Sequence, residues 1–329
     1  MRRVQIRLGP QDFSNVRFVF SPLWECVVAF RVWLDPARHS IFLPWISRVK
    51  RKLAAHDWEP LQSLASVTRG SIPDFVSPPP STPLPELNDE ITHLLRTPAN
   101  IVLAELALTY PRGVPRAIRL GFEDPRRFLQ NVASIVEKFW RLALEPEWPI
   151  IRQRLEGEVL FRARALAFGG PGDLFRDIHR DVSYEAGYLT VLTDCLWEGR
   201  KRKRGILLMP SVFSWPDVFL AIKFPWHPCI TYPASGIADI WSDSVSARPQ
   251  GLSELLGETR ARVLTQLRTP RTTVTAARAL SLSPAAVSEQ IATLRSAGLL
   301  ERTRMGRRVF YSLNANGAAL LSVFANENS

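Results

Sequence analysis

The side chains best suited to recognise a partner lie near the C-terminal end of the chain, on a segment with a helical repeat. One face of this segment would present Ala285, Ala286, Ser288, Glu289 and Thr293, with Gln290 near its edge. Glutamine can form two hydrogen bonds with adenine in the major groove of DNA, and serine can donate to or accept from a base. Alanine can contact the methyl group of thymine, and glutamate can accept from the amino group of cytosine. These residue types are typical of a surface that reads base edges.

An arginine-rich turn follows this segment and adds a second kind of contact. Arg302, Arg304, Arg307 and Arg308 could clamp phosphates or enter the minor groove. Charge at a hairpin tip also protects strand edges from aggregation, so a solvated hairpin is the alternative interpretation. No acidic residue lies between Arg302 and Leu313, which favours DNA as the partner of these cations.

Local signals predict the elements that must position these side chains. Ser283 offers its side-chain oxygen to the first free N–H groups of a helix, and Pro284 takes the first helical position, where proline is tolerated. Gly298 can end this helix, and residues 299–304 and 309–313 then have the pattern of two paired strands. Three apolar residues recur at helical spacing and would face a core: Val287, Ile291 and Leu294. A helix-turn-helix followed by a basic hairpin is the pattern of a winged helix.

Three segments carry a resemblance to a known family. Residues 283–300 (SPAAVSEQIATLRSAGLL) resemble the recognition helix of ArsR/SmtB-type bacterial transcriptional regulators, and residues 304–313 (RMGRRVFYSL) are similar to that family's wing. Residues 255–264 (LLGETRARVL) resemble its opening helices. The resemblance covers residues 251–325 and implies a winged helix that binds duplex DNA and acts as a transcriptional regulator, with repression favoured over activation. The sequence departs from the family's pattern where Ala276 replaces a leucine, Ser281 a turn glycine and Gln290 a histidine.

The positions at which this family binds metals lack suitable ligands here. ArsR-type metal sensors use paired cysteines on the first helix of the DNA-binding pair, or Asp/His pairs on the terminal helix. The corresponding residues 272–281 and 314–327 contain neither cysteine nor histidine. Asp177, His179 and Asp181 alternate and could offer ligands from one strand face, but a junction with solvated carboxylates is the simpler interpretation. We therefore expect no metal site and no cofactor.

The positive charge is densest in the C-terminal part. The chain has 329 residues and a formal net charge of +11. Residues 251–329 hold ten arginines and five glutamates, a net charge of +5, which leaves +6 for the 250 residues before them. This concentration fits a module that faces phosphates.

Cysteine spacing and hydropathy limit the classes to which the protein can belong. The three cysteines lie far apart and form no CxxC pair, which argues against a disulfide framework and a structural zinc site. No apolar run is long enough to span a membrane, and no apolar region of a signal peptide follows the N-terminus. We therefore expect a soluble, cytoplasmic protein.

The preceding 241 residues carry both helical and strand patterns. Helical periodicity appears at 18–34, 86–106, 125–144 and 148–168, and the last of these would end at the GGPG run 169–172. Strand-like runs at 182–184, 188–193, 205–210 and 229–232 predict a small antiparallel sheet. We expect an α+β fold with a mainly helical N-terminal domain at 1–241, a linker at 242–251 and a winged helix at 252–329. The first domain is similar to the large domain of uncharacterised role in some actinobacterial ArsR-type regulators, which implies an architecture but no activity.

The N-terminal domain is the expected place for dimerisation, signal sensing or both. Aromatic and apolar residues concentrate between residues 207 and 241, at Met209, Phe213, Trp215, Phe219, Phe224, Trp226, Tyr232 and Trp241. Most of them should form ordinary core, and a small-molecule pocket with aromatic walls is the alternative. A partner protein could also deliver the signal. Because one winged helix reads few base pairs, we expect a homodimer on a near-palindrome.

Enzyme signatures are missing from the sequence, which has no GxSxG, no GxGxxG after a strand, no P-loop and no HExxH. Ser211, Asp217 and His227 are available as a hydrolytic trio, but the sequence does not show whether they converge. The sequence therefore predicts a DNA-binding transcriptional regulator and not an enzyme. Two alternatives stay open: a winged helix that contacts only proteins, and a ligand-modifying enzyme fused to a winged helix.

Overall fold

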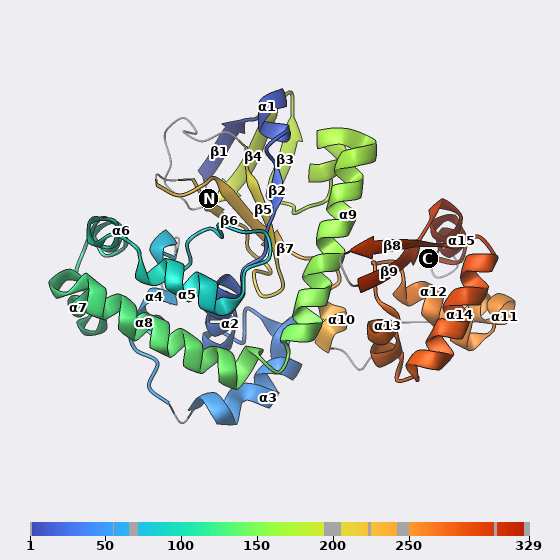
Figure 1. Cartoon of the computed structure of the whole chain (residues 1–329), viewed down its shortest axis with the longest axis horizontal. Helices are drawn as coiled ribbons and strands as arrows, with labels where there is room; N and C mark the ends of the chain where they lie inside the picture. Colours follow the sequence, from blue (N-terminus) through green and yellow to red (C-terminus); the bar gives the residue numbers. More distant parts are fainter. Residues whose placement is uncertain are drawn as a thin grey trace. The chain divides into compact units, whose positions relative to one another are not determined.

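The computed structural model of the chain describes residues 2–54, 56–65, 72–193, 205–222, 225–241, 250–305 and 308–325. They form two compact units, one made of residues 1–149 with 165–234 and the other of residues 150–164 with 235–329. Helix α9 (Trp148–Phe175) is the longest described helix and contributes residues to both units (Figure 1). None of the described helices is long and apolar enough to cross a membrane.

Helix α2 (Pro22–Leu34) lies in the interior of the first unit. Ten of its thirteen residues are buried, and a helix that is apolar on nearly every side is stable only inside a protein. Ser21 caps its first turn by accepting from the Trp24 N–H, and Pro22 takes the first helical position. The predicted helix began four residues too early, because residues 17–18 form the short strand β2 (Arg17–Phe18) instead.

Helices α4 (Leu61–Ala65), α5 (Leu87–Leu95) and α8 (Pro125–Phe139) of the first unit contact α2. The buried residues of α8 recur at helical spacing on one side. The other described helices of this part of the chain are α1 (Pro10–Phe13), α3 (Leu43–Ala54), α6 (Ala99–Thr109) and α7 (Arg119–Glu123).

Two small sheets complete the first unit. The first is antiparallel and has the order β1 (Arg2–Arg7), β4 (Tyr188–Thr193) and β3 (Val182–Glu185). The second has the order β2, β5 (Leu207–Ser211), β7 (Cys229–Pro233) and β6 (Phe219–Ala221).

The second sheet differs from the predicted antiparallel pairing. Strand β5 runs parallel to both β2 and β7, and only the β6–β7 pair is antiparallel. All five residues of β5 and four of the five of β7 are buried. Strands covered on both faces read as continuous apolar runs, and such runs are typical of parallel pairing.

The GGPG run interrupts the helical conformation of α9 at the predicted position. Gly170 leaves the helical conformation with φ 71° and ψ −163°, and the helix then resumes through Pro171 to Phe175. Glycine adopts this backbone conformation readily, and proline is well placed at the start of a new helical turn. The run therefore ends the first helical segment, as predicted, and a kink joins it to a second segment that the sequence did not predict.

The second unit contains the predicted winged helix. Its helices are α10 (Ala238–Trp241), α11 (Gln250–Leu256), α12 (Glu258–Gln266), α13 (Thr273–Leu280), α14 (Pro284–Ser296) and α15 (Ala315–Ala325). Strands β8 (Leu300–Met305) and β9 (Arg308–Leu313) form a separate hairpin. The chain is thus an α+β protein with a mainly helical first part and a C-terminal winged helix, as predicted. Of the predicted linker, residues 242–249 lie outside the described residues, and α11 already begins at Gln250.

Candidate nucleic-acid interface

The predicted signals of the recognition helix α14 are confirmed in detail. The Ser283 side chain accepts from the Ala286 N–H at 3.2 Å, and Pro284 is the first helical residue. Gly298 follows the helix with φ 71°, a left-handed conformation that glycine adopts without strain. The apolar stripe is buried in the core of the second unit: Val287, Ile291 and Leu294.

Helix α13 forms the first half of the helix-turn-helix and packs against α14. Thr272 precedes its first residue and caps the helix by accepting from the Thr275 N–H at 3.4 Å. Ser281 follows its last residue and has φ 54° and ψ 40°, in the left-handed region. Ser281 thus adopts the conformation for which the ArsR-type pattern uses glycine.

The outward face of α14 carries the predicted base-reading side chains. Ala285, Ser288, Glu289 and Thr293 are exposed, and Ala286 is half-buried. The Thr293 hydroxyl donates to the Glu289 carbonyl at 3.1 Å, which leaves the threonine methyl group and the Glu289 carboxylate on the surface.

Two arginines near this face were not predicted as site residues. Arg295 is exposed in the last turn of α14. Arg260, on α12, donates from Nε to the Gln290 side-chain oxygen at 3.1 Å, so the amide is held in place by a cation. Arg295 could have been found from its spacing, because it lies seven residues after Ser288 and therefore on the same side of the helix.

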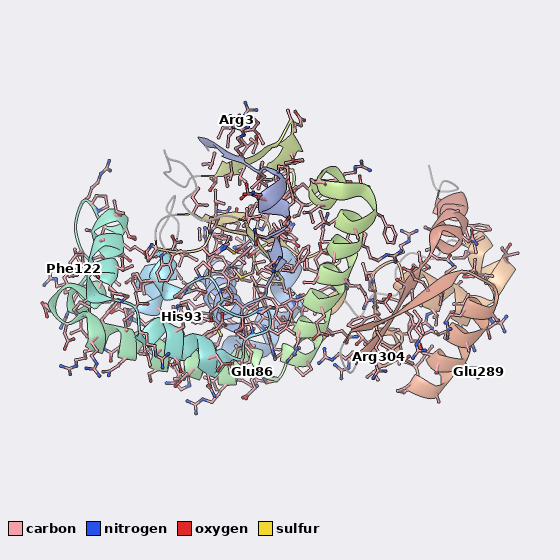
Figure 2. All side chains as sticks on the ribbon, turned by 45° about the horizontal axis from the view of Figure 1, so that its top comes forward. Arg3, Glu86, His93, Phe122, Glu289 and Arg304 are labelled. Atoms are coloured by element: carbon pink, nitrogen blue, oxygen red, sulfur yellow. The ribbon has the colours of Figure 1, made fainter. Side chains whose placement is uncertain are left out.

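The wing hairpin presents cations next to the recognition helix. Arg302 and Arg304 are two residues apart on β8, which places both on one face of the hairpin, and both are exposed. Arg304 and Glu289 are labelled in Figure 2. The hairpin is tied to the start of α13 by paired backbone hydrogen bonds between Arg271 and Tyr311, of 3.0 and 2.8 Å. Arg307 lies outside the described residues.

Arg308 has an acidic partner that the sequence did not reveal. Its guanidinium group lies 2.6 Å from a carboxylate oxygen of Glu156, on α9. The two residues are 152 positions apart, so no local pattern could have indicated the pair. The expectation that the wing cations lack an acidic partner is therefore wrong for Arg308.

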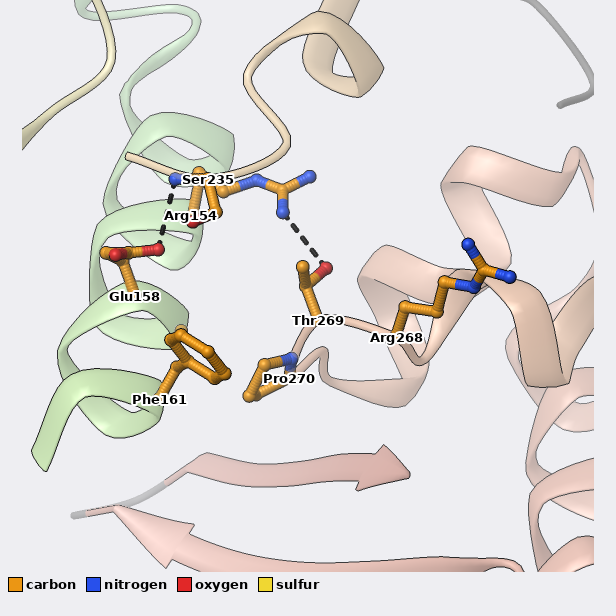
Figure 3. A pocket seen from close by; sticks show the side chains of 8 residues that line it. Arg154, Glu158, Phe161, Ser235, Arg268, Thr269 and Pro270 are labelled. Carbon is orange, nitrogen blue, oxygen red and sulfur yellow. Dashed lines mark hydrogen bonds between the residues drawn. The ribbon is translucent and has the colours of Figure 1, made fainter. Parts of the chain in front are cut away.

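Residues 150–164 of α9 line the winged helix within the second unit. Gln153 donates to the Thr272 hydroxyl at 2.7 Å, and Arg154 donates to the Thr269 hydroxyl at 3.0 Å (Figure 3). Arg164 forms an ion pair with Glu301 on β8. A cavity of about 130 Å³ remains beside these contacts, lined by Arg154, Gly157, Glu158, Phe161, Ser235, Arg268, Thr269 and Pro270 (Figure 3).

The hydrolytic trio considered from the sequence is not assembled by any hydrogen bond among the residues the structure describes. Ser211 is fully buried in β5, and Asp217 forms ion pairs with Arg31 and Arg38. His227 has its Nδ1 atom 3.2 Å from the Pro228 carbonyl oxygen.

The possible ligand set at residues 177–181 forms a compact turn. His179 has Nε2 3.1 Å from the Pro216 carbonyl oxygen, and its Nδ1 atom accepts from the Asp181 N–H at 3.1 Å. Within the described ranges, no group of three or more His, Cys, Asp or Glu residues is arranged to hold a metal ion.

The aromatic cluster between residues 207 and 241 contributes largely to core packing. Phe213 and Tyr232 are buried, and Phe213 stacks on Phe42 with ring centroids 5.0 Å apart. The Trp226 indole N–H donates to Glu105 at 2.7 Å. Phe224 lies outside the described residues.

Comparison with known proteins assigns a class to the second unit. Residues 255–303, from the end of α11 through α14 into β8, match a family of helix-turn-helix domains. The C-terminal part of the chain is a helix-turn-helix domain. Residues 111–238 match a family of unknown function (DUF5937), which assigns no activity to the first unit. No curated protein and no solved structure matches the chain. The helix-turn-helix match indicates a DNA-binding transcriptional regulator.

Proposed function

We propose that the protein is a transcriptional repressor of ArsR type that places α14 in the major groove and the β8–β9 wing on phosphates or in the minor groove. The observation that carries this proposal is the combination of an exposed polar face on α14 with exposed arginines on the adjoining wing. The helix supplies groups that read base edges, and the arginines supply the phosphate contacts that fix register.

Residues of α14 and of β8 have definite parts in this docking. Ser288, Glu289 and Thr293 face the bases, together with the methyl group of Ala285. Gln290 reaches adenine after exchanging its hydrogen bond with Arg260, which is itself exposed and can then contact a phosphate. Arg302 and Arg304 lie on the face of β8 that meets the backbone.

The proposed functional molecule is a cytoplasmic homodimer on a near-palindromic operator. Two-fold symmetric winged helices read two half-sites and gain the specificity that one module lacks. The first unit receives the signal, an organic molecule or a partner protein, and changes the DNA affinity of the second. This control requires the signal to bind more tightly to one of two states of the protein, the state with high DNA affinity or the state with low DNA affinity.

The test removes wing cations from the full chain. Arg302→Ala/Arg304→Ala should weaken binding to every duplex and lower the slope of log K against log salt by about 0.9 for each lost phosphate contact. Gln290→Ala should instead relax base preference at one position, at a cost of about 1–3 kcal/mol for the preferred base. Both are measured by fluorescence anisotropy on randomised and selected duplexes over a salt series.

The matched control removes two arginines from α8. Arg126 and Arg127 are exposed in the first unit, and Arg126→Ala/Arg127→Ala changes the net charge by the same amount. This control should retain the parent's salt slope. If the wing variant and Gln290→Ala both bind DNA like the parent, the docking is wrong and a protein-contacting winged helix becomes the better interpretation.

A further inference from the structure

The contact between α9 and the wing bears on how DNA binding is controlled. Glu156 is 7% exposed and accepts from two arginines, Arg152 at 3.0 Å on its own helix and Arg308 at 2.6 Å on β9. The Arg308 side chain is 39% exposed, so its guanidinium group is reachable from solvent while it is held by a carboxylate. A DNA phosphate would compete with that carboxylate for the same cation.

The exchange of partners would not leave a buried charge uncompensated. When Arg308 leaves, Glu156 keeps its ion pair with Arg152. Losing the only partner of a buried carboxylate costs several kcal/mol, and a retained partner avoids most of that cost. Arg308 can therefore move from Glu156 to a phosphate without destabilising α9.

The seam, where residues 150–164 of α9 contact the winged helix, is a contact that can open and close reversibly. The apolar core of the winged helix is built without residues 150–164, so this core stays closed if α9 moves away. Two hydrogen bonds and an ion pair cross the seam, from Gln153, Arg154 and Arg164, and the adjacent cavity leaves part of the seam unfilled (Figure 3). Close-packed apolar surfaces would hold the two parts more permanently.

Gly157 of α9 determines how closely the backbones of α9 and the winged helix can approach each other at the seam. A Cβ atom at Gly157 would come within 2.8 Å of the Pro270 carbonyl oxygen, in the segment just before α13. The glycine thus permits a close approach of the two backbones that any other residue would prevent. In the interior of a helix glycine costs about 1 kcal/mol relative to alanine, so its place here has to be explained by this approach.

We propose that residues 150–164 of α9 are an intramolecular competitor of DNA, in which Glu156 withholds Arg308 from the phosphate backbone until DNA displaces it. The inference rests on the proposed DNA-binding function and adds its regulation. Arg308 is then a switchable phosphate contact, and Glu156 is a positioning residue that acts through it. Any signal that loosens α9 from the winged helix raises DNA affinity.

The experiment measures the affinity of the full chain for a random-sequence duplex over a salt series. Glu156→Gln should tighten binding about three- to tenfold at low salt and steepen the salt slope by about 0.9, one additional phosphate contact. The gain should vanish in Glu156→Gln/Arg308→Gln relative to Arg308→Gln alone. Glu254→Gln removes an exposed acid of the same unit and should not alter the slope.

A second variant tests the seam without altering charge. Gly157→Ala improves helix propensity but adds a methyl group against Pro270, so it should loosen the seam and tighten DNA binding in the same direction. Gly172→Ala adds the same methyl group to the same helix, where it would meet no atom within 4 Å apart from the neighbouring backbone of the helix itself, and it should bind like the parent.

The outcomes separate the two proposals. If the parent shows no salt-dependent binding to any duplex, the DNA-binding function itself fails. If the parent binds but Glu156→Gln and Gly157→Ala weaken binding or leave it unchanged, α9 is a brace or a bystander, and the inference is overturned while the function stands.

Discussion

At the scale of single residues, burial changes the protonation of two carboxyl groups of the first unit. Glu90 on α5 accepts from the Leu23 N–H at 2.8 Å, and Glu25 on α2 accepts from the backbone N–H groups of Val212 and Phe213. Burial disfavours the charged form and raises the pKa of Glu25 to about 7 and that of Glu90 to about 8, despite these hydrogen bonds. Both side chains therefore hold their protons to higher pH in the folded chain than in the unfolded chain.

This difference predicts how stability depends on pH. Between pH 4.5, the ordinary pKa of a glutamate side chain, and about 8, these two carboxyl groups bind more protons in the folded chain than in the unfolded chain. The free energy of unfolding should therefore fall as pH rises through this window and level off above it. Urea unfolding of the parent and of Glu90→Gln, measured at intervals from pH 5 to 9, checks this expectation.

The glutamine variant should show a shallower decline and gain stability relative to the parent as pH rises. Its side-chain oxygen can still accept from the Leu23 N–H, but it carries no charge to bury. Glu123→Gln on α7 alters an exposed carboxyl group and serves as the control. Parallel curves for the parent and Glu90→Gln would contradict the raised pKa of Glu90.

At the scale of elements, the turn between α13 and α14 has a strained backbone at Ser281, and a single substitution could relieve this strain. Ser281 is held at φ 54°, where a Cβ atom costs about 1–2 kcal/mol, whereas glycine is tolerated there but loses more chain entropy on folding. Ser281→Gly should therefore stabilise the chain by up to about 1 kcal/mol. Ser283→Ala, two residues later, removes the side-chain cap of α14 and should destabilise it by about 1 kcal/mol.

The two substitutions should change the free energy of unfolding in opposite directions within one turn, so each serves as a control for the other. Urea denaturation and amide hydrogen exchange of α14 would record both. A destabilising Ser281→Gly would show that the left-handed backbone at this residue is not the source of strain.

At the scale of the whole molecule, the proposed repressor requires two copies of the chain. Sedimentation at micromolar concentration should give a dimer, and the bound DNA should contain two half-sites about one helical turn apart, or a multiple of it. Two-fold symmetry of the protein produces this spacing, because each copy must meet the same face of the duplex. A monomer both with and without DNA would rule out the arrangement.

Much of the candidate interface could be predicted from the sequence because its determinants are local. The cap at Ser283, the proline after it and the apolar stripe of α14 act within a few residues of one another, and the structure confirms all three. The hairpin of β8 and β9 is local as well, since its strands are joined by a short turn. Helical periodicity and chain stiffness decide such elements before any distant segment is in place.

Other features were decided only by the tertiary structure. The parallel pairing of β5 with β2 and β7 depends on which strands become neighbours. Residues 150–164 join the winged helix although residues 165–249 separate them from α11 in the sequence. The pair of Glu156 with Arg308 exists only because that packing brings a carboxylate to the wing. Local sequence thus determined the second helix of the helix-turn-helix and the cations of its wing, while the folded chain determined which of these cations pairs with a carboxylate, because an ion pair between distant residues requires their elements to be packed side by side.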